Sequence, residues 1–161
     1  MSTEPRYIST VAATRPANTT AYTALDVIGG TSAALSIFEF ANIAPNGGGP
    51  IVLLSASLRW DASALPSGAS QTRLHLFNAS PTGIADNAAF NLIAGDRDKY
   101  LGVINLGTPV DIGDTLYVAD DYLRKSIVAT SSSIFGVAQT VADFTPTSGA
   151  VLNWTLQAVK A

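Results

Sequence analysis

The segment Ile51-Val52-Leu53-Leu54-Ser55-Ala56-Ser57-Leu58-Arg59-Trp60 alternates between hydrophobic and polar residues with a period of two. Successive side chains of a β-strand point to opposite faces, so this period indicates a strand with one buried face. The inner face is predicted to carry Val52, Leu54, Ala56, Leu58 and Trp60, and the outer face Ser55, Ser57 and Arg59.

The same signal recurs along the chain. In the segment 150–160, Leu152, Trp154, Leu156 and Ala158 alternate with Asn153, Thr155 and Gln157. The segment 71–78 directs Leu74 and Leu76 inward and Arg73 and His75 outward. Further candidate strands are 7–13, 33–41, 99–106, 115–119, 123–130 and 133–141, separated by turns rich in Gly and Pro, such as 45–50. About nine short strands with this spacing predict an all-β, single-domain β-sandwich or jelly roll.

Two segments depart from the strand pattern. Asp86 can cap one short helix through 87–91, with Phe90 directed at the core. The first 30 residues are more polar and include Arg15-Pro16, so we expect an extended N-terminal segment over 1–30 and the sandwich over 31–161.

Composition excludes several classes of protein. Charged residues make up only 13% of the 161 residues, the net charge is −3, and the three lysines are scattered, which argues against nucleic-acid binding. The absence of cysteine rules out disulfides and zinc thiolate sites. No apolar run approaches the length of a membrane span and the N-terminus lacks a signal-peptide core, so we expect a protein made in the cytoplasm, without a membrane partner.

Catalytic chemistry has few candidate residues. His75, the only histidine, would have to serve any Ser-His-Asp site, and the favoured interpretation is an exposed strand histidine. Glu4 and Glu39 do not suggest a two-carboxylate cleft. The loop carrying Asp96 and Asp98 contains basic residues as well, which favours a local ion-pair cluster over a calcium site.

Three weaker signals are interpreted structurally. Asp120-Asp121 is read as a solvated turn, and 47–49 lacks the Lys-Ser/Thr pair of a phosphate loop. Trp60 and Trp154 could stack on sugars, but their places beside Leu58 and Leu152 favour the core. We therefore expect no enzyme activity, no metal and no cofactor.

Three groups of segments carry a family resemblance: ATRPANTTAY (13–22) with DVIG (26–29), RLHLFN (73–78) with ADNAAF (85–90), and DRDKYLG (96–102) with LYV (116–118). With these segments the chain resembles capsid decoration, or cement, proteins of tailed bacteriophages. The resemblance implies a virion protein that binds the outer surface of a major capsid shell of the HK97 fold, often as a homotrimer. It supplies no catalytic residues. The alternative from another class is a carbohydrate-binding β-sandwich of a phage fibre or spike.

Contact residues for such a role are predicted from charge and position. The N-terminal segment offers Arg6, Arg15 and Tyr22. If 51–60 and 71–78 pair antiparallel, Arg59 lies opposite Arg73, and His75 extends this basic strip. A carboxylate of the chain itself, Glu39 or a loop aspartate, could pair with the strip. The alternative is that these residues contact the capsid or a neighbouring protomer.

Overall fold

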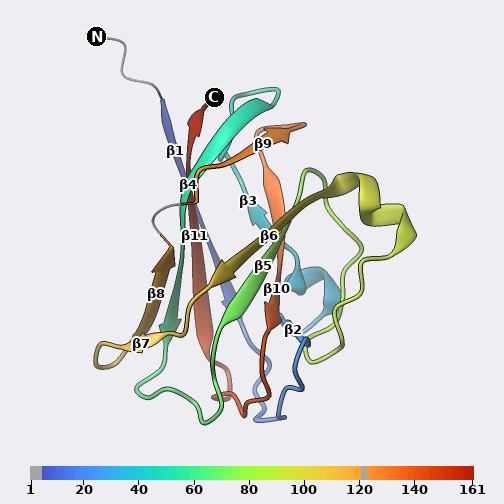
Figure 1. Cartoon of the computed structure of the whole chain (residues 1–161). Coiled ribbons are helices and arrows are strands. Elements are labelled where there is room, and N and C mark those ends of the chain that lie inside the picture. Colours follow the sequence, from blue (N-terminus) through green and yellow to red (C-terminus); the bar gives the residue numbers. More distant parts are fainter. Residues whose placement is uncertain (1–4, 121–122) are drawn as a thin grey trace.

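The computed structural model describes residues 5–120 and 123–161, which form two antiparallel sheets packed as a sandwich (Figure 1). The first sheet has the order β1-β11-β4-β8-β7, and β9 pairs with the remaining part of β4. Its strands are β1 (Arg6–Thr14), β4 (Gly49–Asp61), β7 (Val110–Asp111), β8 (Leu116–Asp120), β9 (Lys125–Ala129) and β11 (Val151–Lys160). The all-β sandwich predicted from the alternating segments is confirmed.

The second sheet has the order β2-β10-β5-β6, with β3 also pairing with β10. Its strands are β2 (Val27–Ile28), β3 (Phe38–Phe40), β5 (Thr72–Phe77), β6 (Tyr100–Leu106) and β10 (Ile134–Thr140). The central strand β10 contains no charged residue and is almost completely buried, as expected for a strand covered on both faces.

The main core fills the space between the sheets. Trp60 of β4 and Trp154 of β11 are 1% and 0% exposed, so their predicted core position is confirmed. Trp154 stacks on Phe38 of the opposite sheet, with ring centroids 5.9 Å apart. The Trp154 ring therefore links the two sheets.

The alternation of β4 changes phase halfway along the strand. Ala56, Leu58 and Trp60 are buried as predicted, but in the first half Ile51 and Leu53 are buried while Val52 and Leu54 are only partly covered. The register with β11 shifts at this point, where Gln157 faces Ser55 and Ala158 faces Leu53. Leu54 is thus an extra residue in a β-bulge, which moves the preceding residues to the other face. The predicted inward position of Val52 and Leu54 was wrong.

The predicted helix over 87–91 was also wrong. Asp86 and Asn87 form a turn, and Asn87 adopts a φ of 61°, which helix propagation does not allow. Short 3-10 helices occur instead at η1 (Ala33–Ser36) and η2 (Ala94–Lys99). The strand predicted over 33–41 is consequently limited to β3, because its first half forms η1.

The first 30 residues contribute to both sheets. β1 pairs with β11 along its whole length, from Arg6–Val159 to Thr14–Val151, and β2 pairs with β10. The described part of the N-terminal segment is therefore built into the sandwich. No helix among the described residues is long and apolar enough to span a membrane.

Candidate functional site

The predicted basic strip does not exist. β4 lies in the first sheet and β5 in the second, so Arg59 and Arg73 are not cross-strand neighbours. Arg59 lies between Asn153 and Tyr117, whereas Arg73 lies between Gln139 and Asn105. The hypothesis failed because it assumed that strands close in sequence pair with each other, and the connection 62–71 instead crosses to the other sheet.

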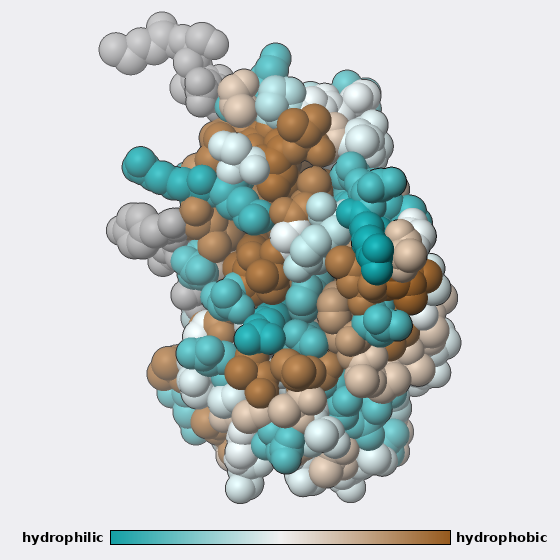
Figure 2. Space-filling model, turned by 45° about the vertical axis from the view of Figure 1, so that its right-hand side comes forward, coloured by the Kyte–Doolittle hydropathy of each residue, from teal (hydrophilic) through white to brown (hydrophobic). Residues whose placement is uncertain are grey.

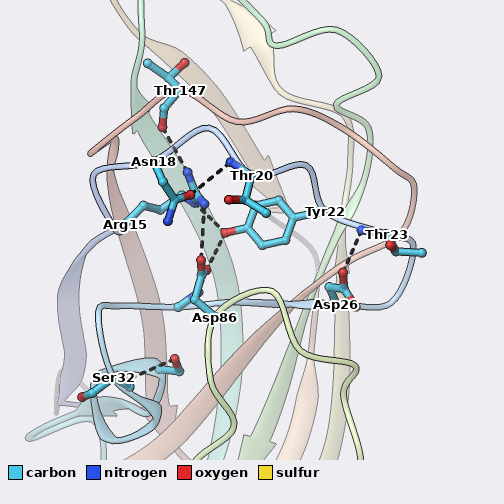
Figure 3. Close-up of polar contacts among 11 residues, drawn as sticks. Arg15, Asn18, Thr20, Tyr22, Thr23, Asp26, Ser32, Asp86 and Thr147 are labelled. Atoms are coloured by element: carbon cyan, nitrogen blue, oxygen red, sulfur yellow. Dashed lines mark hydrogen bonds and ion pairs between the residues drawn. The ribbon is translucent and has the colours of Figure 1, made fainter.

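Two of the predicted contact residues, Arg15 and Tyr22, follow β1 in the chain and are buried. The Arg15 and Tyr22 residues are 1% and 2% exposed, and both belong to a polar network centred on Asp86 (Figure 3). Arg15 Nε donates to Tyr22 Oη over 2.5 Å, and Tyr22 Oη donates to Asp86 Oδ1 over 2.5 Å. Arg15 Nη2 lies 3.3 Å from Asp86 Oδ2, and Arg15 Nη1 donates to the Thr147 carbonyl. Neither side chain is available to a partner in the folded protein.

This network ties three distant segments together. Asp86 Oδ1 also accepts from the Gly29 backbone N–H over 2.9 Å, so the carboxylate binds residues of 15–29 while Arg15 holds the loop at Thr147. Burial and the hydrogen bond to Asp86 raise the pKa of Tyr22 well above its usual range, so the hydroxyl stays protonated and donates. The ion pair and the phenol stabilise the end of the sandwich near Pro16.

A cavity of about 270 Å³ adjoins this network. It is lined by Pro16, Asn18, Thr20, Gly30, Thr31, Ser32, Ala85, Asp86 and Asn87. Both carboxylate oxygens of Asp86 already accept hydrogen bonds from the protein. The rest of the lining is uncharged, which gives the cavity no evident preference for an ionic ligand.

His75 is buried, and its prediction as an exposed histidine was wrong. The ring lies on the outer face of the second sheet, but Phe90 of the long loop before η2 stacks on it with centroids 3.9 Å apart. His75 Nε2 bonds Gln139 Oε1 over 3.0 Å, and Nδ1 bonds Tyr100 Oη over 3.0 Å. Gln139 Nε2 donates to the Leu25 carbonyl, so Gln139 Oε1 faces the histidine. The His75 proton is therefore on its Nε2, and His75 Nδ1 accepts from the Tyr100 hydroxyl.

Burial lowers the pKa of His75, with the nearby Arg73 acting in the same direction and the hydrogen bond to Gln139 opposing it. The neutral ring is therefore favoured. A small second cluster surrounds it, with Val27, Phe77 and Val137 buried and Phe90 and Tyr100 packed against them. The loop carrying Phe90 covers this face of the second sheet. Phe90 therefore packs on this second cluster, and not in the main core between the sheets.

The acidic loop residues form an ion pair. Asp96 Oδ1 accepts from Lys99 Nζ over 2.8 Å and Oδ2 accepts from the Thr82 backbone N–H, and the bond to Lys99 is the main reason that the pKa of Asp96 is lowered. Asp98 is exposed. Among the described residues no three His, Asp or Glu side chains form a cluster that could hold a metal ion. Asp121 lies outside the described residues.

The outer face of the first sheet carries mostly small polar residues. The strand registers place Tyr117, Arg59, Asn153 and Ala12 in one row across β8, β4, β11 and β1. The next row contains Ser57, Thr155 and Thr10, and the hydroxyls of Thr10 and Thr155 lie 2.8 Å apart. Strands are about 4.8 Å apart, so the first row, extended to Val110 of β7, spans about 19 Å. We call the surface formed by Thr10, Ala12, Ser57, Arg59, Tyr117, Asn153 and Thr155 the open face.

Charge on the open face is nearly cancelled. Arg59 forms an exposed ion pair with Asp61, with Nε 3.5 Å from Oδ1. Side chains such as Ser and Thr lose little conformational entropy when a partner covers them. Of the six predicted contact residues, Arg59 lies on this face, and Arg6 is exposed on β1 at its margin.

One margin of the open face is apolar. Val110, Ile112 and Tyr117 of the β7–β8 hairpin are 63%, 65% and 40% exposed, and Val110 pairs directly with Tyr117. The sequence signal was the hydrophobic Ile112 inside an Asp-Ile-Gly-Asp turn, where Gly113 N donates to Asp111 Oδ1. On the face shown in Figure 2, brown residues gather in the upper part of the view, and smaller brown areas below are separated by teal and white residues.

Comparisons with known proteins define no family for this chain. No protein-family model matches it, and no curated protein matches its sequence. Among solved structures, the chain is similar to one titled as the acidic stable capsid of Helicobacter pylori bacteriophage KHP30 (13% identity, TM-score 0.33, 98% of this chain and 90% of that one). It is also similar to Turnip yellow mosaic virus (11%, 0.31, 99% and 83%). A third match is the K3 adhesin domain of Lys-gingipain from Porphyromonas gingivalis (9%, 0.30), where it covers 78% of this chain and 63% of that one. Structural similarity at this level establishes no common function.

Proposed function

We propose that the protein is a virion structural protein that decorates the outer surface of a major capsid shell and stabilises it. The observation that supports this role best is the open face, a sheet surface of mostly small polar side chains. Its one charged residue, Arg59, is paired with Asp61, and its margin at Val110, Ile112 and Tyr117 is apolar. The rigid two-sheet core behind it keeps this surface in one shape, so binding requires little ordering of the protein.

The shell partner is proposed to have the HK97 fold, as the family resemblance implies. Stabilisation follows from mass action, because a protein that binds the assembled shell and not its separate subunits favours the assembled state. The proposal includes no catalytic step: both ring nitrogens of His75 are engaged by Tyr100 and Gln139, and neither partner is a carboxylate that could orient the ring.

The carbohydrate-binding alternative has lost its main support. It rested on Trp60 and Trp154 as stacking platforms for sugar rings, and both are buried between the sheets.

A charge placed at the centre of the open face tests the proposal. Ser57 is flanked by Thr155 in the neighbouring strand, and an arginine there adds an unpaired, bulky cation to the contact. We expect Ser57→Arg to weaken co-sedimentation with undecorated, expanded capsids by at least about tenfold, which corresponds to about 1.4 kcal/mol.

The matched control is Asn91→Arg, which adds the same charge at an exposed position of the loop that covers the other sheet. It should bind like the unmodified protein, and thermal melting should show both variants folded. Equal binding by Ser57→Arg and the unmodified protein would place the contact elsewhere on the molecule.

A further inference from the structure

The first sheet ends in a long strand with one free side. β1 is the last strand of the order β1-β11-β4-β8-β7 and extends over Arg6–Thr14, so within the described chain no strand pairs with its outer edge. Side chains of alternate residues along it, including Ile8 at 57%, are exposed.

The backbone groups that face this free side can be identified. Arg15 N donates to the Ala150 carbonyl, and these two residues continue the register of β1 with β11. In an antiparallel ladder, hydrogen-bonded pairs alternate with pairs whose N–H and C=O groups point away. The groups of Arg6, Ile8, Thr10, Ala12 and Thr14 therefore point to the free edge and can pair with another strand.

β1 lacks the features that usually prevent edge strands from pairing. Natural edges are short, bulged, charged or interrupted by proline. The register of β1 with β11 contains no shift, no residue from Tyr7 to Thr14 is charged, and the prolines Pro5 and Pro16 lie just outside the strand. An edge of this kind is a template for another strand.

We propose that this edge pairs antiparallel with β1 of a second copy of the chain, about a two-fold axis at Thr10. In this register Thr10 faces Thr10 of the second copy, Ile8 faces Ala12, and Arg6 faces Thr14. Each outward-facing residue of one strand then lies opposite an outward-facing residue of the other. Five such pairs with two backbone hydrogen bonds each give about ten hydrogen bonds. Arg6, the only charged residue of the strand, lies opposite an uncharged threonine, so no like charges meet.

A register shifted toward the C-terminal end fits less well. Shifting the pair by one step toward the C-terminal end brings Pro16 into the ladder, where it has no N–H to donate. The Thr10-centred register keeps both flanking prolines outside and uses the full strand. It also aligns the two open faces on one side of a continuous sheet, because directly opposite residues share a face.

The absence of cysteine makes the register directly measurable. In the Thr10→Cys variant, the two introduced thiols occupy a directly opposed pair with Cα atoms about 5.5 Å apart, a distance suited to a disulfide. In Ile8→Cys the two thiols are about 13 Å apart along the strands and are not expected to react. Oxidation should therefore cross-link Thr10→Cys into a covalent dimer, leave Ile8→Cys monomeric, and join Ile8→Cys to Ala12→Cys when the two are mixed.

Sedimentation of the cysteine-free protein gives the second test. The unmodified chain should form dimers as its concentration rises, and Thr10→Pro should shift it to monomer, since its N–H faces away from β11 and its loss leaves the internal ladder intact. Thr10→Lys, which brings two like charges together, should do the same, and Thr19→Lys at an exposed position outside the strand should not.

Three results would overturn the proposal: a monomer at every concentration, an oligomer unaffected by Thr10→Pro and Thr10→Lys, or equal cross-linking of Thr10→Cys and Ile8→Cys. None of these readouts involves capsids, so failure here is distinguishable from failure of the decoration proposal.

Discussion

Arg15 holds a full positive charge inside the protein, with its side chain completely shielded from solvent. A buried guanidinium is tolerated because Asp86, the Tyr22 hydroxyl and the Thr147 carbonyl together accept from it. From the sequence alone an arginine beside proline in a polar segment resembled a surface contact. Asp86 and Thr147 are 71 and 132 residues away in the chain, so no local pattern could reveal the network.

Removal of the Arg15 charge should strongly destabilise the fold. Arg15→Met leaves the Asp86 carboxylate buried without its cation, and breaking a buried ion pair typically lowers the free energy of unfolding by about 3–5 kcal/mol. Urea denaturation measures this loss. The exposed Arg97 is the matched control, because Arg97→Met should change stability by no more than about 0.5 kcal/mol. Similar losses in the two variants would show that the network contributes little.

At the level of single elements, the sequence predicted where strands occur better than how they pair. The alternating segments correctly located β1, β4, β5, β6, β8, β9, β10 and β11, because side-chain alternation is a local consequence of strand geometry. Pairing depends on distant residues, so β4 was matched with β5 although its neighbours are β11, β8 and β9. The bulge at Leu54 was not visible because both Leu53 and Leu54 are hydrophobic, and either can occupy the inner face.

The loop before β4 offers a matched pair of glycines for an element-level prediction. Gly47 and Gly48 adopt φ values of 86° and 84°, but a Cβ on Gly47 would meet open space, whereas one on Gly48 would lie 2.5 Å from the Ala129 carbonyl oxygen at the end of β9. Gly47→Ala should therefore lower the free energy of unfolding only by the cost of a left-handed backbone conformation, about 1–2 kcal/mol. Gly48→Ala should lower the free energy of unfolding clearly more, because the loop must also move away from β9.

Chemical denaturation of both variants measures the difference. Equal destabilisation would mean that the loop relaxes without cost and does not fix the position of β9 against β4.

For the whole molecule, the sequence predicted the fold class but only a small part of the candidate surface. Arg59 was singled out and lies on the open face, whereas Val110, Ile112 and Tyr117 gain their importance only when β7 and β8 come to lie beside β4. His75 is covered by a loop whose path over the second sheet has no sequence periodicity to reveal it. Surfaces assembled from several strands therefore had to be read from the structure.

The central claim is that the protein stabilises a capsid shell by binding its outer surface. The most direct measurement is the thermal melting of undecorated, expanded capsids with increasing amounts of the purified protein. The decoration role predicts that the melting temperature of the shell rises with protein concentration and levels off when the sites are filled, because binding favours the assembled state. A shell that melts at the same temperature at every protein concentration would contradict it.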